Sequence, residues 1–161
     1  MSQFLRDSQL FKGLSDAQLQ LLSAILRETV VAQGSRLFEQ GAPATYLYVV
    51  GRGRVGLEMR LERPDGSVTH TTTVASAGAG DAFGWSAVVP PHMLTLSAFA
   101  QEPSTLVLVE GEKLRVLLNR NHDVGYLVMV NVANLLADRL AQTREAFVYE
   151  RDWVFEEKGQ K

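Results

Sequence analysis

The sequence predicts a mainly β domain with helices at both ends. Short β-branched and aromatic segments separated by glycine turns fill the middle of the chain, while leucines before them and apolar residues after them recur at helical spacing. The length of 161 residues, with 46% hydrophobic and 21% charged residues, fits one compact domain. We therefore expect a single domain over 1–161, with helices over 1–26, a barrel of strands over 27–110 and helices over 111–161.

The N-terminal segment is predicted to be helical. Ser15 is followed three residues later by Gln18, which resembles a capping box, in which each side chain bonds the other residue's backbone. Leu19, Leu22 and either Ile25 or Leu26 then recur at helical spacing.

The middle segment is predicted to be antiparallel β structure. Turn signals with glycine separate its segments, and Pro64-Asp65-Gly66 between two alternating segments is typical of a hairpin. Many short strands with regular turns favour a closed or sandwiched architecture, because this avoids exposed strand edges. The segments expected to be strands are 29–31, 36–38, 46–50, 55–59, 68–74, 94–100 and 105–109.

The C-terminal segment is predicted to form a short helix over 111–118 and a long helix from about Val124 to at least Phe147. The long helix carries an apolar stripe in steps of four and three residues, which suits a helix–helix seam. We expect the first half of the stripe to cover the barrel of its own chain and the second half to meet a partner helix in a homodimer. The stripe consists of Met129, Ala133, Leu136, Leu140, Thr143 and Phe147.

Composition excludes several classes of protein. The net charge of −2 gives no general attraction to nucleic acid or to anionic lipid. The absence of cysteine excludes disulfides and thiolate metal sites. No signal-peptide core is present at the N-terminus, and the longest apolar runs fall short of a membrane span. We expect a cytoplasmic protein with no membrane partner.

The most informative stretch is the turn from Gly80 to Gly84, followed by Trp85-Ser86-Ala87. Glycines allow backbone N–H groups to converge on an anion, and a short helix directly after the turn would point its positive end at it. However, no Lys or Arg occurs between Arg63 and Lys113. A pocket built on this turn would have a backbone cradle without a local fixed cation.

Four motifs, in this order and at this spacing, resemble the cyclic-nucleotide-binding domain family of the catabolite-activator type. They are Leu10-Phe11-Lys12-Gly13-Leu14-Ser15, Glu39-Gln40-Gly41 followed by 46–50, Gly53-Arg54-Val55, and Gly80-Asp81-Ala82-Phe83-Gly84. The resemblance extends from about Leu10 to Phe147. It implies an eight-stranded antiparallel jelly-roll barrel that binds a ligand inside, with helices packed outside. It would make this chain a stand-alone regulatory domain.

The chain departs from the family at two positions of the phosphate-binding cassette. Where the family has a Glu that binds the ribose, this sequence has Trp85, and where it has an Arg that pairs with the cyclic phosphate, this sequence has Leu94, or Met93 if the loop is one residue shorter. Each lost charge-assisted hydrogen bond costs roughly 1.5–3 kcal/mol, about ten- to a hundredfold in affinity. These departures argue against cyclic AMP or cyclic GMP as the ligand, although a cyclic nucleotide is the ligand that the resemblance implies.

The resemblance also indicates which residues would line a ligand site. Trp85 would be a plug that fills the vacated pocket or a platform on which a ligand stacks; its volume favours the plug. Backbone or hydroxyl donors of 84–87 would face a phosphate, and Asn131, Asn134 and Asp138 would cap a base. His92 is either a surface residue or, when protonated, a partner for an anion. The candidate ligand-binding residues are Phe83, Gly84, Trp85, Ser86, Ala87, Leu94, Thr95 and Ser97.

Catalysis is not indicated. His70, His92 and His122 do not have a metal-ligand spacing, and no nucleophile elbow or Walker loop is present. Two function classes remain: a sensor in which a small anionic ligand alters the packing of the C-terminal helices, and a non-binding scaffold for dimerisation or for a partner protein. A true cyclic AMP or cyclic GMP binder that uses backbone donors is a further alternative.

Direct DNA binding is not expected. Family members that bind DNA carry a helix-turn-helix domain after the long helix, and this sequence ends about where such a domain would begin. In a sensor, coupling would run from the turn at Phe83 to Leu114 and Leu117 of the short helix and then into the long helix.

Overall fold

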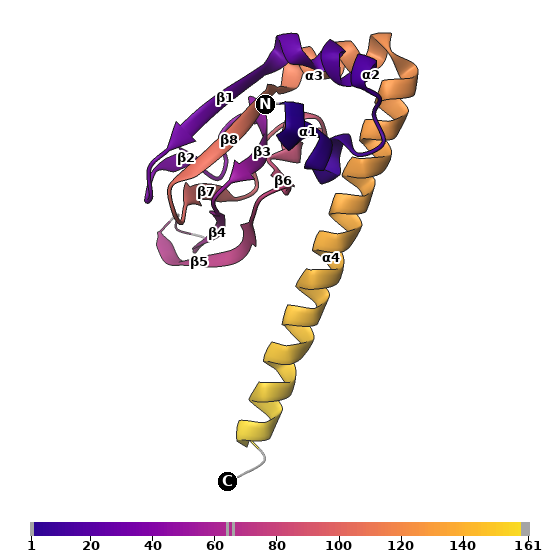
Figure 1. Ribbon diagram of the computed structural model, residues 1–161. Coiled ribbons are helices and arrows are strands. Elements are labelled where there is room, and N and C mark those ends of the chain that lie inside the picture. Colours follow the sequence, from indigo (N-terminus) through magenta and orange to yellow (C-terminus); the bar gives the residue numbers. More distant parts are fainter. Residues whose placement is uncertain (1, 64, 66, 159–161) are drawn as a thin grey trace.

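Along the chain, eight strands separate an N-terminal from a C-terminal set of helices in the computed structural model, which describes residues 2–63, 65 and 67–158. Figure 1 shows both sets of helices on the same side of the strands. The N-terminal helices are α1 (Ser2–Asp7), η1 (Gln9–Phe11), α2 (Asp16–Leu22) and η2 (Ser23–Ile25). The strands are β1 (Leu26–Val31), β2 (Arg36–Phe38), β3 (Tyr46–Arg52), β4 (Val55–Glu62), β5 (Val68–Ala77), β6 (Ala82–Phe83), β7 (Ser97–Ala100) and β8 (Ser104–Glu110). The single-turn helix η3 (Trp85–Ala87) follows β6, and α3 (Gly111–Arg120) and α4 (His122–Lys158) end the chain.

The strands form two four-stranded antiparallel sheets. The first has the order β1-β8-β3-β6 and the second the order β2-β7-β4-β5. The prediction of mainly β structure with flanking helices is therefore confirmed. Within the described residues no strand pairing joins the two sheets, so the expected eight-stranded jelly-roll barrel is not confirmed. A sandwiched arrangement also buries the sheet faces, which is why the strand pattern alone did not distinguish it from a barrel.

The central strands β3 and β8 of the first sheet are buried on both faces, whereas the edge strand β1 is largely exposed. Side chains of neighbouring residues in a strand point to opposite faces, and in β3 Tyr48 and Val50 pack between the sheets while Leu47 and Val49 pack against the helices. The helices contribute to the cluster of buried side chains between them and the first sheet the residues Leu10, Phe11, Leu19, Leu22, Leu114, Val124, Val128 and Val132. The molecule thus has three layers, with the first sheet in the middle.

The N-terminal helices are held by specific caps. Ser15 accepts a hydrogen bond from the Gln18 backbone, and the Gln18 side chain accepts one from the Ser15 backbone, so the predicted capping box is confirmed. Asn131 of α4 donates to the backbone oxygens of Leu10 and Lys12, both at 2.9 Å. This amide fixes α4 against η1.

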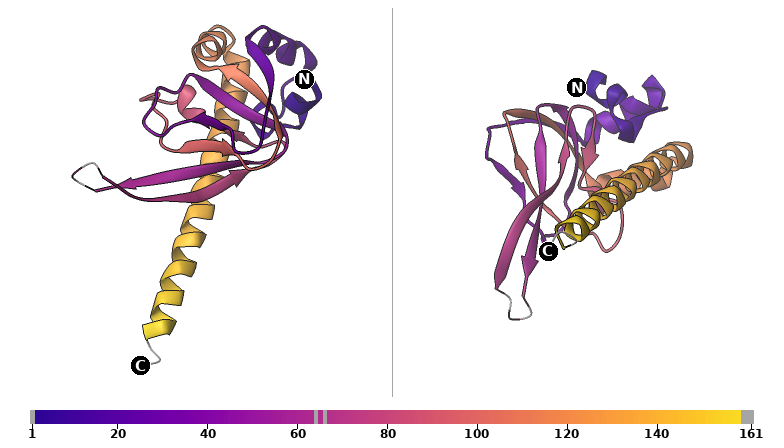
Figure 2. Two further views of the ribbon diagram at one scale, coloured as in Figure 1. Left: turned by 90° about the vertical axis from the view of Figure 1, so that its left-hand side faces the viewer. Right: turned by 90° about the horizontal axis from the view of Figure 1, so that it is seen from below.

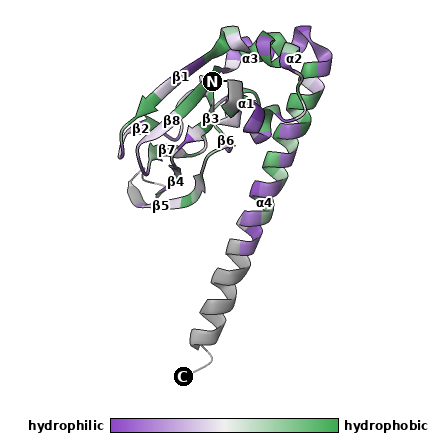
Figure 3. Cartoon of the chain, in the orientation of Figure 1, coloured by the Kyte–Doolittle hydropathy of each residue, from purple (hydrophilic) through white to green (hydrophobic). Residues whose placement is uncertain are grey.

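Figure 3 shows apolar and polar residues mixed along the described part of α4, and its apolar residues divide into a buried set and an exposed set. Val124, Val128 and Val132 are buried against the chain's own core, whereas Met129 is 43% and Leu140 51% exposed. The prediction that the first half of the stripe covers its own chain is therefore wrong, because that contact is made by the neighbouring face. For Phe147, the last residue of the predicted stripe, the structure does not describe the side chain.

Length and composition alone would allow one described helical segment, His122–Glu145, to cross a membrane, and 22% of its most apolar stretch is buried. One such helix is weak evidence for a membrane span. The segment is apolar enough for this because it carries both the buried apolar residues and the exposed apolar stripe.

The β4–β5 hairpin is confirmed, with Val55 opposite Ala77 and Leu61 opposite His70. Figure 2 shows this hairpin projecting beyond the rest of its sheet. Of the predicted turn, Pro64 and Gly66 lie outside the described residues. The two-residue strand β6, where we expected a turn, pairs with Tyr48 and Val49 of β3.

Candidate functional site

The turn singled out by the sequence lies at the end of β6, next to β3. Gly84 has φ of +74°, and a Cβ at this residue would lie 3.0 Å from the Tyr46 backbone oxygen and 3.1 Å from the Tyr48 ring. A side chain here would be strained by the backbone conformation, and the Tyr46 carbonyl or the Tyr48 ring would have to move by a few tenths of an ångström to make room. The Asp81 carboxylate accepts from the Gly78 backbone at 2.9 Å and from the Gln9 amide at 3.3 Å, so it braces the turn.

A small cavity of about 30 Å³ lies behind this turn, between the sheets. None of the nine residues that line it in the described part of the chain is ionisable. Six of them were among the eight predicted site residues, namely Phe83, Gly84, Trp85, Ser86, Leu94 and Thr95. The other three are Phe38, Leu57 and Leu96.

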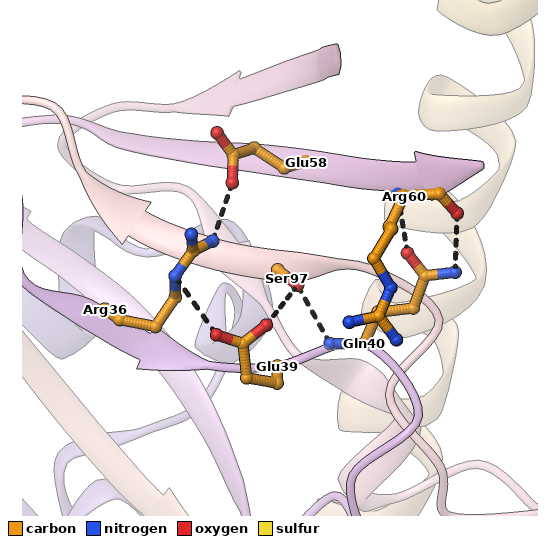
Figure 4. Close-up of polar contacts among 6 residues, drawn as sticks. All are labelled: Arg36, Glu39, Gln40, Glu58, Arg60 and Ser97. Carbon is orange, nitrogen blue, oxygen red and sulfur yellow. Dashed lines mark hydrogen bonds and ion pairs between the residues drawn. The ribbon is translucent and has the colours of Figure 1, made fainter. Parts of the chain in front are cut away.

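Ala87 and Ser97 do not line this cavity. Ala87 is buried, and its carbonyl oxygen accepts a hydrogen bond from the Arg115 guanidinium of α3. The Ser97 hydroxyl accepts from the Gln40 backbone at 2.9 Å and donates to Glu39 at 3.1 Å (Figure 4). Both residues hold elements together in this structure.

Ser97 belongs to a polar network that joins β2, β4 and β7. Arg36 forms ion pairs with Glu39 at 3.3 Å and with Glu58 at 2.6 Å (Figure 4). The Gln40 side chain accepts from the Arg60 backbone at 2.8 Å and donates to its carbonyl at 3.3 Å. These bonds connect three strands of the second sheet. Two of the bonded residues, Glu39 and Gln40, belong to the motif that resembles the cyclic-nucleotide-binding domain family.

The cassette position that the family fills with Arg is occupied here by an apolar residue. Leu94 is 6% exposed and lines the cavity, whereas Met93 is 40% exposed and forms an isolated bridge with Pro43. Leu94 is therefore the residue of this pair that faces the cavity. An anion there would find backbone and hydroxyl groups of Gly84, Ser86 and Thr95, but no cationic side chain from the nine lining residues.

Trp85 borders two cavities. Besides the 30 Å³ cavity, it lines a second one of about 90 Å³ together with Asp81 and with Leu135, Arg139 and Gln142 of α4. Arg139 lines only the second cavity and donates to Gln142 at 3.3 Å. Trp85 is thus part of the wall between the apolar interior and a polar crevice along α4.

Aromatic rings form one wall of the interior. The Tyr48 and Phe83 rings stack with centroids 5.0 Å apart and planes at 7°, and Phe38 packs on both. Burial raises the pKa of Tyr48 to about 12, neighbouring Tyr46 adds to this rise, and Arg27 opposes it. The phenol stays neutral at ordinary pH and supplies no charge for ligand binding.

The remaining candidates lie outside the interior cavity. His92 has φ of +60°, and its Nδ1 lies 3.0 Å from the Ser86 backbone oxygen. Asn134 and Asp138 line a crevice of about 250 Å³ beside Gln9 and Lys12, and Asn131, which also borders it, is bonded to η1. The three α4 residues proposed to cap a base are therefore together, and one of them, Asp138, also lines the 90 Å³ cavity that Trp85 borders.

Sequence reasoning missed Phe38 and Leu57, because they reach the cavity from strands far from the turn. It also missed Arg115, whose link to Ala87 joins α3 to η3. The amphipathic pattern of 111–118 placed a helix there, but nothing in that pattern indicated which backbone carbonyl its arginine would bond.

Comparison with known proteins agrees with this architecture. A model of the cyclic nucleotide-binding domain family matches residues 28–121. The chain is 31% identical over 142 residues to the cyclic AMP receptor protein of Thermus thermophilus, a match that covers 86% of this chain and 60% of that relative's length. The chain thus spans 60% of the length of that curated relative.

Solved structures show the same fold. The N-terminal domain of a transcriptional regulator from Streptomyces coelicolor is 30% identical with a TM-score of 0.66, over 89% of this chain and 94% of that one. A cyclic nucleotide-binding domain from Methylobacillus flagellatus has a TM-score of 0.77 at 20% identity, over 92% of this chain and 80% of that one. Because the family model covers more than half of the sequence, this chain belongs to the cyclic nucleotide-binding domain family.

Proposed function

We propose that this chain is a non-enzymatic regulatory module whose interior does not accept cyclic AMP or cyclic GMP. The observation that carries the proposal is the interior cavity of about 30 Å³. One water occupies roughly 30 Å³ of liquid, and small-molecule sites measure roughly 300–1,000 Å³. Trp85, which stands where the family has a ribose-binding Glu, forms part of the wall of this reduced space.

Electrostatics support the same conclusion. A cyclic phosphate buried beside Leu94 would lose its hydration and meet no fixed positive charge from the residues that line the cavity. Burial of an unpaired charge costs several kcal/mol, and roughly 1.5–3 kcal/mol per missing charge-assisted bond is not recovered. Backbone donors of 84–87 would have to replace both lost partners.

We propose further that two chains pair through α4 in the cytoplasm. Tyr126, Met129, Val130, Leu136 and Leu140 are all large apolar residues that are more than a third exposed, and they form one face of the helix. A continuous apolar stripe of this kind favours a second helix as its partner. The single domain over 1–161 would then contribute its jelly-roll-like sandwich and one helix to a homodimer.

In a sensor, the route from the interior to this seam would run through η3. Ala87 contacts Gly111 at the start of α3, and its carbonyl accepts from Arg115. A ligand that displaced Trp85 would move η3 against α3 and so change the elbow between α3 and α4. The small cavity equally favours a second candidate, a non-binding scaffold that keeps the fold for dimerisation or for a partner protein.

Thermal shift and calorimetry with cyclic AMP, cyclic GMP and cyclic dinucleotides test the proposal. We expect no ligand-dependent rise in melting temperature for the wild-type chain, since only ligands that bind the folded state stabilise it. The double variant Trp85→Glu/Leu94→Arg should gain binding of cyclic AMP. Trp85→Glu/Met93→Arg is the matched control, because Met93 is exposed and does not line the cavity.

Saturable binding of a cyclic nucleotide by the wild-type chain at micromolar concentration would overturn the proposal. It would favour instead a true second-messenger receptor that uses the backbone donors of the cassette. A gain of binding by both double variants would show that position 94 does not control the charge of the cavity.

A further inference from the structure

A groove of about 360 Å³ lies at the elbow between α3 and α4, much larger than the cavity behind the cassette. Val88, directly after η3, forms one side. The helices supply Arg115, Leu118 and Asn119 from α3, and His122, Gly125, Tyr126 and Met129 from α4. These positions follow the helical repeat of three and four residues, so each helix presents one continuous face to the groove.

The floor of the groove is tight and its walls are mixed. A Cβ at Gly125 would lie 2.8 Å from the Leu118 backbone oxygen, so the two helices touch there. Leu118 and Val88 are each 8% exposed, while Tyr126 is 72% exposed at the rim. The groove therefore offers an apolar base and polar side chains near its mouth.

The charge of the lining has one sign. Of the eight residues that line the groove in the described part of the chain, Arg115 is cationic and none is acidic. Arg115 is half-buried, and its bond to the Ala87 carbonyl uses one of the five N–H donors of a guanidinium. Partial burial strengthens the attraction of this group for an anion, and its planar fork suits carboxylate and phosphate oxygens.

We infer that the α3–α4 elbow is a second ligand site, for a small organic anion with a compact apolar body. The acidic group would lie on Arg115, with Asn119 and His122 as further hydrogen-bonding partners. The apolar body would lie on Leu118 and Val88 at the base, whereas Tyr126, at the rim, belongs to the proposed dimer seam. The volume of about 360 Å³ is within the range of small-molecule sites, roughly 300–1,000 Å³.

Such a ligand would act on the same turn as the cassette, from the other side. Arg115 already bonds the carbonyl of Ala87, the last residue of η3. An anion held by the same guanidinium would fix both the turn and the helix elbow. This site is separate from the interior cavity, so it does not depend on the proposed loss of cyclic-nucleotide binding.

Phenyl phosphate is a suitable probe, followed by calorimetry and by amide NMR of the full chain. Phenol and inorganic phosphate carry only the apolar or only the anionic half, and both should bind at least roughly tenfold more weakly. The amide signals of Leu118, Asn119 and Gly125 should shift on titration. The amide signals of Gly84 and Thr95, at the interior cavity, should shift less than those of the groove residues.

Two substitutions on the same helix separate a site from general charge attraction. Arg115→Gln should weaken phenyl phosphate binding roughly ten- to a hundredfold, the cost of one charge-assisted bond. Arg120→Gln removes the same charge from a residue that does not line the groove, and should leave the affinity unchanged. His122→Gln, at an exposed position, provides a second lining variant with little risk to folding.

The inference is overturned if phenyl phosphate does not bind at millimolar concentration, or if Arg115→Gln and Arg120→Gln weaken it equally. It is also overturned if the groove amides are already protected by the partner subunit and shift only when the dimer dissociates. In that case the occupant of the groove is the second copy of the chain. Circular dichroism and thermal melts of each variant establish that a loss of binding is not a loss of fold.

Discussion

Gly111 packs directly on Ala87. A Cβ at Gly111 would lie 2.7 Å from the Ala87 carbonyl oxygen and 2.8 Å from the Ala87 Cβ. Gly111 also donates its backbone N–H to the Thr45 carbonyl at 2.9 Å, so it cannot retreat without losing that bond. The first residue of α3 is therefore locked to the turn that bears Trp85, and this joint connects the cassette to the C-terminal helices.

The first prediction follows from that contact. Gly111→Ala should lower the free energy of unfolding by about 1–3 kcal/mol, the usual cost of overpacking. Helix propensity alone would raise stability by up to about 1 kcal/mol, so the sign of the change decides which effect dominates. Urea denaturation of the wild type and of Gly111→Ala measures this change in the free energy of unfolding.

Gly78→Ala is the matched control, because the nearest atom to its Cβ would be the Asp81 carboxylate at 4.0 Å. This control should be near neutral. If Gly111→Ala is as stable as the wild type, the joint between η3 and α3 is looser than the geometry indicates.

The second prediction concerns pH. The pKa of Tyr48 is raised from 10.0 to about 12 in the folded chain, chiefly by burial. Above the unfolded pKa the unfolded phenol releases its proton while the folded one keeps it, so stability is complete below pH 10 and falls as pH approaches 12. The loss is about 1.4 kcal/mol per unit of pKa difference, or roughly 3 kcal/mol in all.

Denaturation of the wild type and of Tyr48→Phe across this alkaline range checks the second prediction. Tyr48→Phe should remove the part of the alkaline decrease in unfolding free energy that Tyr48 causes. Tyr126→Phe, at an exposed position, should show the same decrease as the wild type. Equal alkaline loss in the wild type and in Tyr48→Phe would contradict it.

The sequence was sufficient to predict most elements because their signals are local. The Ser15–Gln18 cap, the alternating segments and the helical repeat after Glu110 each depend on neighbours within a few residues. In β3, the continuous apolar run from Leu47 to Val50 reflects burial on both faces, between the second sheet and the helices. Pairings such as β1 with β8 join distant segments, and no local signal specifies them.

Cavity-lining residues on or near the turn were among the predicted site residues, whereas lining residues that depend on packing were not. Thr95 lines the cavity from the segment just before β7, whereas Ser97, the first residue of β7, bonds to Glu39 and Gln40 instead. Phe38 and Leu57 come from other strands. Which of the two apolar faces of α4 packs against the chain's own core likewise depends on the position of η1, which the helical repeat does not specify.

The third prediction tests the exposed face of α4. Light scattering should show a dimer for the wild type, and Leu136→Glu should convert it to a monomer at the same concentration, because two buried carboxylates would face each other across the seam. Asn134→Glu adds the same charge on a polar flank of the helix and should remain a dimer. A wild-type chain that is monomeric at high micromolar concentration would exclude the seam.

The fourth prediction addresses Trp85 as the group that fills the interior. Trp85 is partly buried and packs against the core cluster on the helical side of the first sheet. Trp85→Ala should therefore cost about 3 kcal/mol, the lower end of the range for a buried Trp. Met93→Ala, an exposed neighbour on the same loop, should change stability little.

Indole then tests whether the vacated space is a binding cavity. The space left by Trp85 would lie between the apolar cavity lined by Phe83, Leu94 and Leu96 and the polar crevice along α4, and its apolar side would favour an apolar molecule with one polar edge. Added indole should raise the melting temperature of Trp85→Ala in proportion to the logarithm of its concentration once it exceeds the dissociation constant, and should not stabilise the wild type. If indole stabilises both proteins equally, or neither, the side chain of Trp85 is not what closes the interior, and its removal from the path of a ligand cannot be the switch in this fold.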